Sequence, residues 1–244
     1  MRVIAALVSA LVFFTAPLLA EPIRLVSNAG AINNQALGFA LREVYRRAGL
    51  EMTITPIPAE RAAHMLDNGE FDGVVGRVSG FGDTRPDLIR LEPPINTIIT
   101  TAFILPERGH RIESRDDLKD KTVGVVRGIV HSRRAAAEAA DMIEVDRPEQ
   151  LFLMLKSNRI DVAVHGAFSS HAEVELLTDY GIVLSEVPIG TINSHHFLRD
   201  TLRQEAAVVA SILREMVDEG EFGTLFQIER ARLIAETAAG EPGN

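Results

Sequence analysis

Arginine residues follow three short apolar runs of this sequence. Arg61 comes shortly after MTITPI, Arg77 directly follows FDGVVG, and Arg127 directly follows TVGVV. A guanidinium group can hold a carboxylate with two parallel hydrogen bonds, and it does so best where water is excluded. The pattern therefore predicts a site for a small anionic or zwitterionic solute. A surface ion pair is the competing interpretation for each arginine taken alone, since the chain has 34 acidic residues.

Several other polar or small residues also stand just after an apolar run. In open parallel sheets, small molecules bind beyond the carboxyl ends of the strands, where loops diverge and helix N-termini point their amides inward. Arg77 is the strongest single candidate, because it would start inside that crevice. His165 has a competing interpretation as a side chain packed against neighbouring backbone. The predicted ligand-binding residues are Asn28, Glu60, Arg61, Gly76, Arg77, Arg127 and His165.

Metal, cofactor and nucleophile motifs are missing from the sequence. His195 and His196 are adjacent, and adjacent strand residues face opposite sides, so the two cannot bind one ion. No other spacing of histidines and carboxylates matches a metal motif, and no phosphate-binding glycine signature or nucleophile elbow occurs. Ser169 and Ser170 lack a recognisable partner pattern. We expect no metal, no cofactor and no catalytic residue.

Strand and helix signals alternate in the first part of the chain. Apolar runs rich in branched residues predict strands at 23–27, 52–57 and 71–76, and apolar residues at helical spacing predict helices from Asn34 to the glycine at 49 and over 60–69. This alternation predicts a parallel sheet covered on both faces. Glycine and proline make 79–87 and 91–95 loops, and the β-branched segment 97–105 is predicted as a strand that leads away.

A second round of the same signals follows. Ser114 is predicted to cap a helical turn, and the next elements are strands at 122–126, 142–145 and 160–164 with helices at 132–140 and 148–158. The similarity of NGEFDGVVG to SNRIDVAVHG suggests two lobes of like topology. Segments 182–190 and 195–199 are predicted as strands that return to the first lobe. Two helices then end the chain, with apolar residues at Val208, Ile212 and Val217 on one and at Phe222, Leu225 and Phe226 on the other.

The first twenty residues have the layout of a secretory signal peptide. Arg2 is their only charge, an apolar run follows it, and Ala20 stands before Glu21. A membrane anchor is the alternative, but Ser9, Thr15 and Pro17 interrupt a run already short for a span of about 20 residues. We therefore expect export to the periplasm with removal of residues 1–20.

Composition limits the class of partner. Without Arg2, 24 basic residues face 34 acidic ones, a formal net charge near −10. Nucleic acid is therefore excluded as an expected partner, and an anion site has to be a local arginine cluster within an acidic whole. The chain has no cysteine, so its core must hold without disulfides. About 224 residues would remain after export, enough for two compact lobes.

Four segments in order resemble a known family: ERAAHMLDNGEFDGVVGR, LIRLEPPI, DLKDKTVGVVRG and LKSNRIDVAVHG. The chain resembles extracellular solute-binding proteins of family 3, the periplasmic substrate-binding components of bacterial ABC importers, and looks closest to a divergent branch. The resemblance implies the periplasmic-binding-protein-like type II α/β fold, with two α/β lobes joined by a two-segment hinge. Lobe 1 would comprise 21–105 and 189–244, and lobe 2 would comprise 106–188.

The resemblance also implies a function. A small amino-acid-like solute would bind between the lobes, hinge closure would follow, and an ABC permease in the inner membrane would receive the solute. We expect the binding protein itself to be a monomer. Departures from the family pattern at Arg85 and Gly166, where an arginine is out of register and an acidic residue is replaced, make an ordinary amino acid a doubtful ligand.

Two alternatives to transport remain open. The first is an enzyme on the same fold, similar to the periplasmic cyclohexadienyl dehydratases, with Glu60 as the candidate general acid. The second is a periplasmic partner that presents the solute to a membrane sensor.

Overall fold

The computed structural model describes residues 21–166 and 177–238, so the predicted signal peptide, Ser169 and Ser170 lie outside the described residues. Strand and helix alternate first as predicted. The elements are β1 (Ile23–Asn28), α1 (Ile32–Arg47), β2 (Met52–Ile57), α2 (Ala59–Asp67) and β3 (Gly73–Val78). Both helices end before a glycine in the left-handed region, with φ of 68° at Gly49 and 82° at Gly69. Glycine adopts this conformation without strain, so these two helix ends were predictable.

The remaining elements follow in two groups. After a short 3-10 turn (Ser79–Gly82), the middle of the chain forms β4 (Leu88–Arg90), β5 (Asn96–Ile104), β6 (Thr122–Val126), α3 (Val130–Ala135), β7 (Asp141–Val145), α4 (Pro148–Lys156) and β8 (Val162–Gly166). The end of the described chain forms β9 (Val183–Leu184), β10 (Gly190–Arg199), α6 (Arg203–Asp218) and α7 (Glu221–Ala238). Ser114 caps the 3-10 turn Arg115–Leu118 with a capping box, as predicted.

The strands form one sheet whose path runs β2-β1-β3-β10-β5-β8-β6-β7. β1 pairs in parallel with β2 and β3, and β6 pairs in parallel with β7 and β8. β10 and β5 run antiparallel to their neighbours and join the two parallel groups. The parallel sheet predicted for the strands of the first part is therefore confirmed, and β10 adds to it an antiparallel strand whose direction was not predicted.

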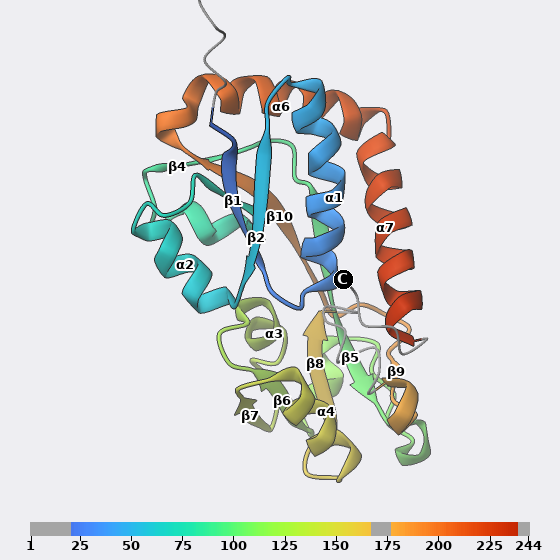
Figure 1. Ribbon diagram of the computed structural model, residues 1–244. Coiled ribbons are helices and arrows are strands. Elements are labelled where there is room, and N and C mark those ends of the chain that lie inside the picture. Colours follow the sequence, from blue (N-terminus) through green and yellow to red (C-terminus); the bar gives the residue numbers. More distant parts are fainter. Residues whose placement is uncertain (1–20, 167–176, 239–244) are drawn as a thin grey trace, which may run out of the picture.

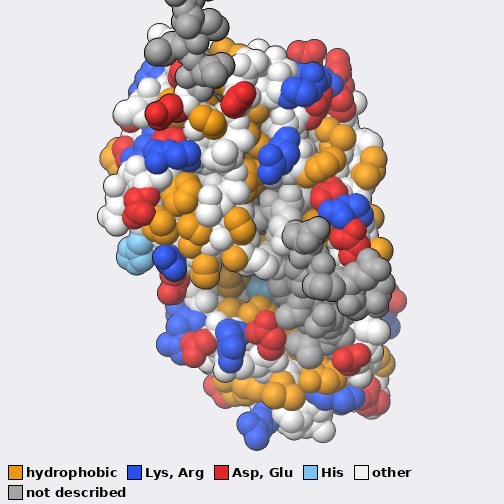
Figure 2. Space-filling model, viewed as in Figure 1, with side chains coloured by type: hydrophobic (Ala, Val, Ile, Leu, Met, Phe, Trp, Pro, Cys, Tyr) orange, Lys and Arg blue, Asp and Glu red, His pale blue; other side chains and the backbone are white. Residues whose placement is uncertain are grey.

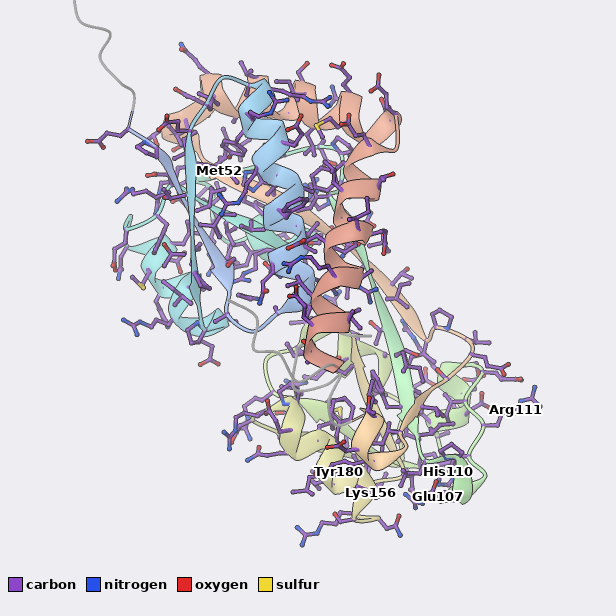
Figure 3. All side chains as sticks on the ribbon, turned by 45° about the vertical axis from the view of Figure 1, so that its right-hand side comes forward. Met52, Glu107, His110, Arg111, Lys156 and Tyr180 are labelled. Carbon is purple, nitrogen blue, oxygen red and sulfur yellow. The ribbon has the colours of Figure 1, made fainter. Side chains whose placement is uncertain are left out.

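Two groups of elements lie at the two ends of this sheet, and the long strands β5 and β10 run between them (Figure 1). We call β1, β2 and β3 with α1, α2, α6 and α7 the first lobe, and β6, β7 and β8 with α3 and α4 the second lobe. In the first lobe, α1 and α7 cover one face of the sheet and α2 the other. Figure 3 shows the two lobes from another side, with Lys156 and Tyr180 at the far end of the second lobe. There, Lys156 Nζ donates a hydrogen bond to the Tyr180 carbonyl at 3.0 Å.

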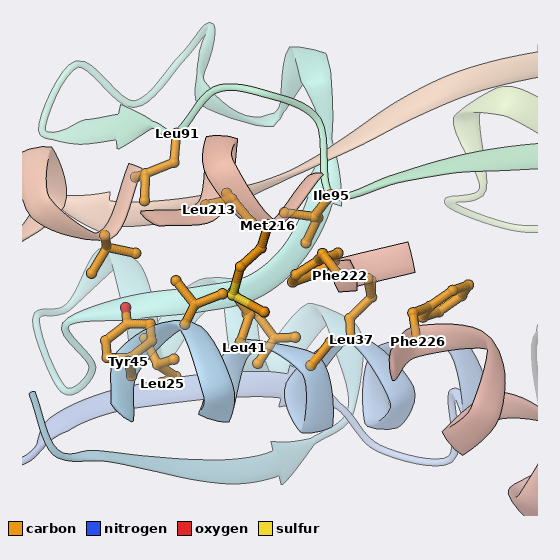
Figure 4. Packing of buried hydrophobic residues seen from close by; sticks show 14 of the residues in the cluster. Leu25, Leu37, Leu41, Tyr45, Leu91, Ile95, Leu213, Met216, Phe222 and Phe226 are labelled. Carbon is orange, nitrogen blue, oxygen red and sulfur yellow. The ribbon is translucent and has the colours of Figure 1, made fainter. Parts of the chain in front are cut away.

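Each lobe has its own buried apolar clusters. Leu37, Leu41 and Tyr45 on α1 pack against Met216 and Phe222 in the first lobe, and all five are at most 2% exposed (Figure 4). The second lobe has two separate clusters, one of which contains the edge-to-face pair Phe103 and Phe152. Each large apolar side chain so buried contributes about 1.5–3 kcal/mol. The first lobe and the second lobe are therefore each held by apolar clusters of their own.

The structure corrects three local predictions. The helix expected over 132–140 is Val130–Ala135, because Asp141 must already pair with Thr122 in the β6–β7 ladder. The strand expected over 182–190 is reduced to Val183–Leu184, since the Ser185 hydroxyl donates to the Val187 carbonyl at 3.0 Å and turns the chain before Pro188. The third concerns the buried face of α6.

The buried face of α6 is displaced from the predicted one. Strand β4, which pairs with β10, lies between the two segments predicted as loops and contradicts neither. Val209, Leu213 and Met216 are buried, whereas Val208 is 47% exposed. The helix is apolar at neighbouring positions, so packing against α1 and α7, not the local pattern, selects which of them faces inward.

Candidate functional site

Asn28, Gly76 and Arg77 come together at the carboxyl ends of β1 and β3. Asn28 is the last residue of β1, and Gly76 and Arg77 lie near the end of β3, which pairs with β1. Gly76 is buried, while Asn28 and Arg77 are half-buried. A side chain at position 76 would meet Leu37 Cδ1 at 3.2 Å, so glycine there keeps the strand close to α1. Two predicted site residues with polar side chains are thus neighbours.

The guanidinium group of Arg77 contacts only uncharged groups among the described residues. Its Nη1 donates a short hydrogen bond to Asn28 Oδ1, and its Nη2 donates to the Ala59 carbonyl at 3.3 Å. Its Cζ lies 5.4 Å from the centre of the Phe81 ring. Burial, and secondarily the positive charge of Arg85, lowers the pKa of Arg77 to about 10, so the group is still charged at neutral pH. Within 21–166 and 177–238, no carboxylate pairs with this cation.

Arg85 differs from Arg77 in having an acidic partner. Its Nε and Nη2 donate to the two carboxylate oxygens of Asp67 at 2.8 and 3.1 Å, and its Cζ lies 4.2 Å from the Phe81 ring centre. Phe81 therefore contacts both guanidinium groups, one compensated and one not. The sequence analysis missed Phe81. The signal that could have identified it was a lone aromatic between two arginines in a segment otherwise read as loop.

Glu60 and Arg61 lie in the first turn of α2, directly after Ala59, whose carbonyl Arg77 contacts. Both side chains are exposed, so neither is enclosed by the structure. Arg127 is also exposed, and its Nε lies 3.1 Å from Asp146 Oδ1 in a pair whose side chains are 63% and 73% exposed. Such a pair contributes little to stability. The structure thus joins Arg77 to Asn28 by direct contact but joins neither Arg61 nor Arg127 to Arg77.

His165 belongs to a second polar cluster, where β8 and α3 meet the strand β5. We call Thr100, His131, His165 and Gly166 the histidine cluster. Thr100 Oγ1 and His131 Nδ1 are 2.8 Å apart, and His165 pairs with Thr101 in the ladder next to Thr100 and Gly166. Burial lowers the pKa of His131 to about 4, and burial together with His131 lowers the pKa of His165 to about 4. Both rings are therefore neutral at neutral pH.

Two buried polar atoms of this region have no hydrogen-bond partner within residues 21–166 and 177–238. They are Nδ1 of His165, a residue only 5% exposed, and Oγ of Ser132, which follows His131 and is fully buried. Buried polar atoms are normally paired, so an unpaired donor or acceptor indicates capacity for a further hydrogen bond. The sequence analysis named His165 but missed Thr100, His131 and Ser132, because nothing local marks them.

Surface pockets away from these residues are no better candidates. One, of about 320 Å³, lies between the C-terminal end of α1 and the start of β2; another, of about 540 Å³, lies beside β7 and α4. Neither is lined by a predicted ligand-binding residue. Within the described part of the chain, no three metal-ligating side chains gather, and no helix is long and apolar enough to cross a membrane.

Comparison with known proteins supports the fold. No family model matches the chain. An uncharacterised protein of Shewanella oneidensis is 24% identical over 190 residues, which cover 71% of this chain and 68% of that protein. A solved amino-acid ABC transporter substrate-binding protein of Streptococcus pneumoniae, bound to L-arginine, is similar with a TM-score of 0.65 and 12% identity over 87% of this chain and 96% of that one.

Two further solved structures are also similar to this chain. The GluR0 ligand-binding core in complex with L-glutamate gives a TM-score of 0.67 at 14% identity, covering 85% of this chain and 97% of that one. An ancestral amino-acid-binding protein, described as a precursor of cyclohexadienyl dehydratase, gives 0.64 at 16%, covering 84% and 94%. At these identities the likeness shows the fold alone. The chain has the periplasmic-binding-protein-like type II α/β fold, with two lobes joined by a two-segment hinge, as predicted.

Proposed function

We propose that this protein is a periplasmic solute-binding protein that captures a small anionic or zwitterionic, amino-acid-like solute between its lobes. One observation carries the proposal: Arg77 is a half-buried cation at the carboxyl end of a strand, and no carboxylate of the described residues compensates it. A buried charge is costly unless it is paired. A bound anion would supply the missing partner and add a bidentate hydrogen bond.

The fold supports the same proposal. Solved proteins with this fold include ABC transporter substrate-binding proteins. In our proposal residues 1–20 are a signal peptide, lobe 1 comprises 21–105 and 189–244, and lobe 2 comprises 106–188. The protein acts as a monomer, closes around the solute by bending at β5 and β10, and delivers the solute to an ABC permease in the inner membrane.

Thermal unfolding of residues 21–244 with a library of amino acids and small organic acids tests the proposal. A ligand at about 100 times its dissociation constant stabilises the folded protein by about 2.7 kcal/mol, which raises the unfolding temperature. The Arg77→Gln variant should lose this response. Arg214→Gln removes the same charge from the exposed face of α6 and should respond like the wild type.

The test compares the ligand-induced stabilisation of Arg77→Gln with that of Arg214→Gln. If Arg77→Gln folds and still binds with wild-type affinity in a calorimetric titration, Arg77 is not in the site. If no compound of the library binds the wild-type protein, the solute-binding proposal itself is refuted.

An enzyme on this fold is the second candidate, favoured by the likeness to the precursor of cyclohexadienyl dehydratase. Such an enzyme needs a general acid beside its substrate. Glu60 lies in the first turn of α2, next to Ala59, whose carbonyl contacts Arg77. Turnover of a prephenate-like acid by the wild type but not by Glu60→Gln would favour the enzyme, whereas binding without turnover favours transport or presentation to a membrane sensor.

A further inference from the structure

The histidine cluster of the second lobe consists of uncharged groups, and this limits the class of ligand that it can bind. Its central ring, His131, is half-buried, and its contacts are uncharged. Thr100 Oγ1 lies 2.8 Å from Nδ1, and a methyl group placed on Gly166 would lie 3.6 Å from His131 Cε1 and 3.5 Å from Ile98 Cγ2. The ring thus lies over Gly166 beside an aliphatic side chain. Val130, next to it at the start of α3, is 50% exposed.

The cluster lies where a solute between the lobes would meet the second lobe. α3 contacts β8 and both of the strands β5 and β10 that connect the lobes. In Figure 2, basic, acidic and hydrophobic side chains are interspersed over the visible face of the molecule. His131 is half-buried, so part of its surface is open to a ligand. Nδ1 of His165, on the neighbouring strand β8, has no hydrogen-bond partner among the described residues. The cluster can therefore offer neutral hydrogen-bonding groups and an aliphatic surface to a ligand.

The charges of the described residues proposed to face the solute do not balance. Arg77 contributes one positive charge with no carboxylate partner among them, and Arg85 is neutralised by Asp67. Glu60 and Arg61 are exposed and opposite in charge, and both histidines are neutral at neutral pH. A zwitterion enclosed here would leave the net charge at plus one. A monoanion would bring it to zero, and an enclosed net charge is costly.

We propose that the ligand is a small organic acid without an ammonium group, bound with its carboxylate on Arg77 and its uncharged body against His131, Thr100 and Ile98. The inference rests on the proposed function and narrows its solute class. His131 then acts as a specificity-determining residue: it recognises a neutral part of the ligand and provides no countercharge for an amine.

Matched pairs of ligands test this inference. Titration calorimetry on residues 21–244 compares L-leucine with isocaproate, L-glutamate with glutarate and L-alanine with propionate, where each pair differs by the amine. We expect the deaminated member of every pair that binds to be tighter by roughly tenfold or more. Tighter binding of the amino acids would overturn the inference and leave the solute-binding proposal standing. Binding of no member, together with no response to the wider library, would overturn both.

Two variants at one position locate the effect. His131→Gln keeps a neutral polar group and should keep the preference for the deaminated acid. His131→Glu adds a carboxylate beside Thr100 and Gly166, and it should shift the ratio of dissociation constants toward the amino acid by roughly tenfold or more. An unchanged ratio in a folded His131→Glu variant would remove His131 from the site.

A measurement on the wild-type protein covers the case in which a variant fails to fold. In protein labelled with ¹⁵N-histidine, the tightest deaminated acid of the pairs should move the imidazole signals of His131 on titration. The signals of His64, exposed on α2, provide the control. Saturating ligand that leaves the His131 signals unmoved would also overturn the inference.

Discussion

His196 makes the stability of the first lobe sensitive to mild acid. The ring is fully buried, its Nδ1 lies 2.8 Å from the Val74 carbonyl, and its Nε2 lies 2.8 Å from the Tyr45 hydroxyl. A carbonyl can only accept, so Nδ1 carries the proton and Nε2 accepts from Tyr45. Protonation of Nε2 would remove that acceptor and place a charge in an apolar core. Burial accordingly lowers the pKa of His196 to about 4.

The direction and size of the effect follow from linkage. The unfolded chain binds a proton near the ordinary pKa of about 6.5, whereas the folded protein resists it down to about 4, so stability is complete above pH 6.5 and is lost as the pH falls through that window. At about pH 5 the loss is roughly 2 kcal/mol for one such histidine. His165 and His131, whose pKa values burial also lowers to about 4, each add a similar loss. Together the three histidines remove about 6 kcal/mol, against a typical total of 5–15 kcal/mol.

Urea unfolding followed by circular dichroism at about pH 7.5 and pH 5 measures this loss, and few carboxylates titrate in that interval. His196→Gln should lose roughly a third of the pH difference, whatever its stability at pH 7.5. His64→Gln removes an exposed histidine of α2 and should keep the full difference. If His196→Gln is too unstable to measure, His165→Gln serves in its place. Equal stability of the wild type at both pH values would refute the reasoning.

Two further predictions concern packing. A methyl group at Gly73 would lie 2.5 Å from the Phe197 carbonyl oxygen, so Gly73→Ala should destabilise the protein by about 1–3 kcal/mol in urea unfolding. Gly223→Ala in α7 meets nothing within 4 Å and should instead stabilise by about 0.5–1 kcal/mol; the same sign for both variants would contradict the argument. Phe152→Ala empties a fully buried position of the second lobe and should cost about 3–5 kcal/mol, where a loss below 1 kcal/mol would show that the core refills.

Local patterns predicted most of the elements, because each depends on neighbours in the chain. The apolar run at Met52–Ile57 and the proline that begins Pro148–Lys156 both led to correct elements. The direction of β10 was not predictable in this way, since a strand has the same local pattern in a parallel as in an antiparallel ladder. The choice of Val209 over Val208 for the buried face of α6 likewise depended on which neighbours α1 and α7 present.

Some features of the candidate site likewise followed from local sequence, and others depended on the tertiary structure. The sequence by itself determined that Asn28 and Arg77 end apolar strands, and pairing of those strands brings the two side chains into contact. It ranked Arg77 first but also named Arg127, because both follow an apolar run. Only the surroundings leave Arg77 half-buried without a carboxylate partner among the described residues and Arg127 exposed beside Asp146. Thr100 and His131 are 31 positions apart and meet only where α3 packs on β5. Burial and countercharge are properties of the folded chain, so the tertiary structure alone decided which charge lacks a partner.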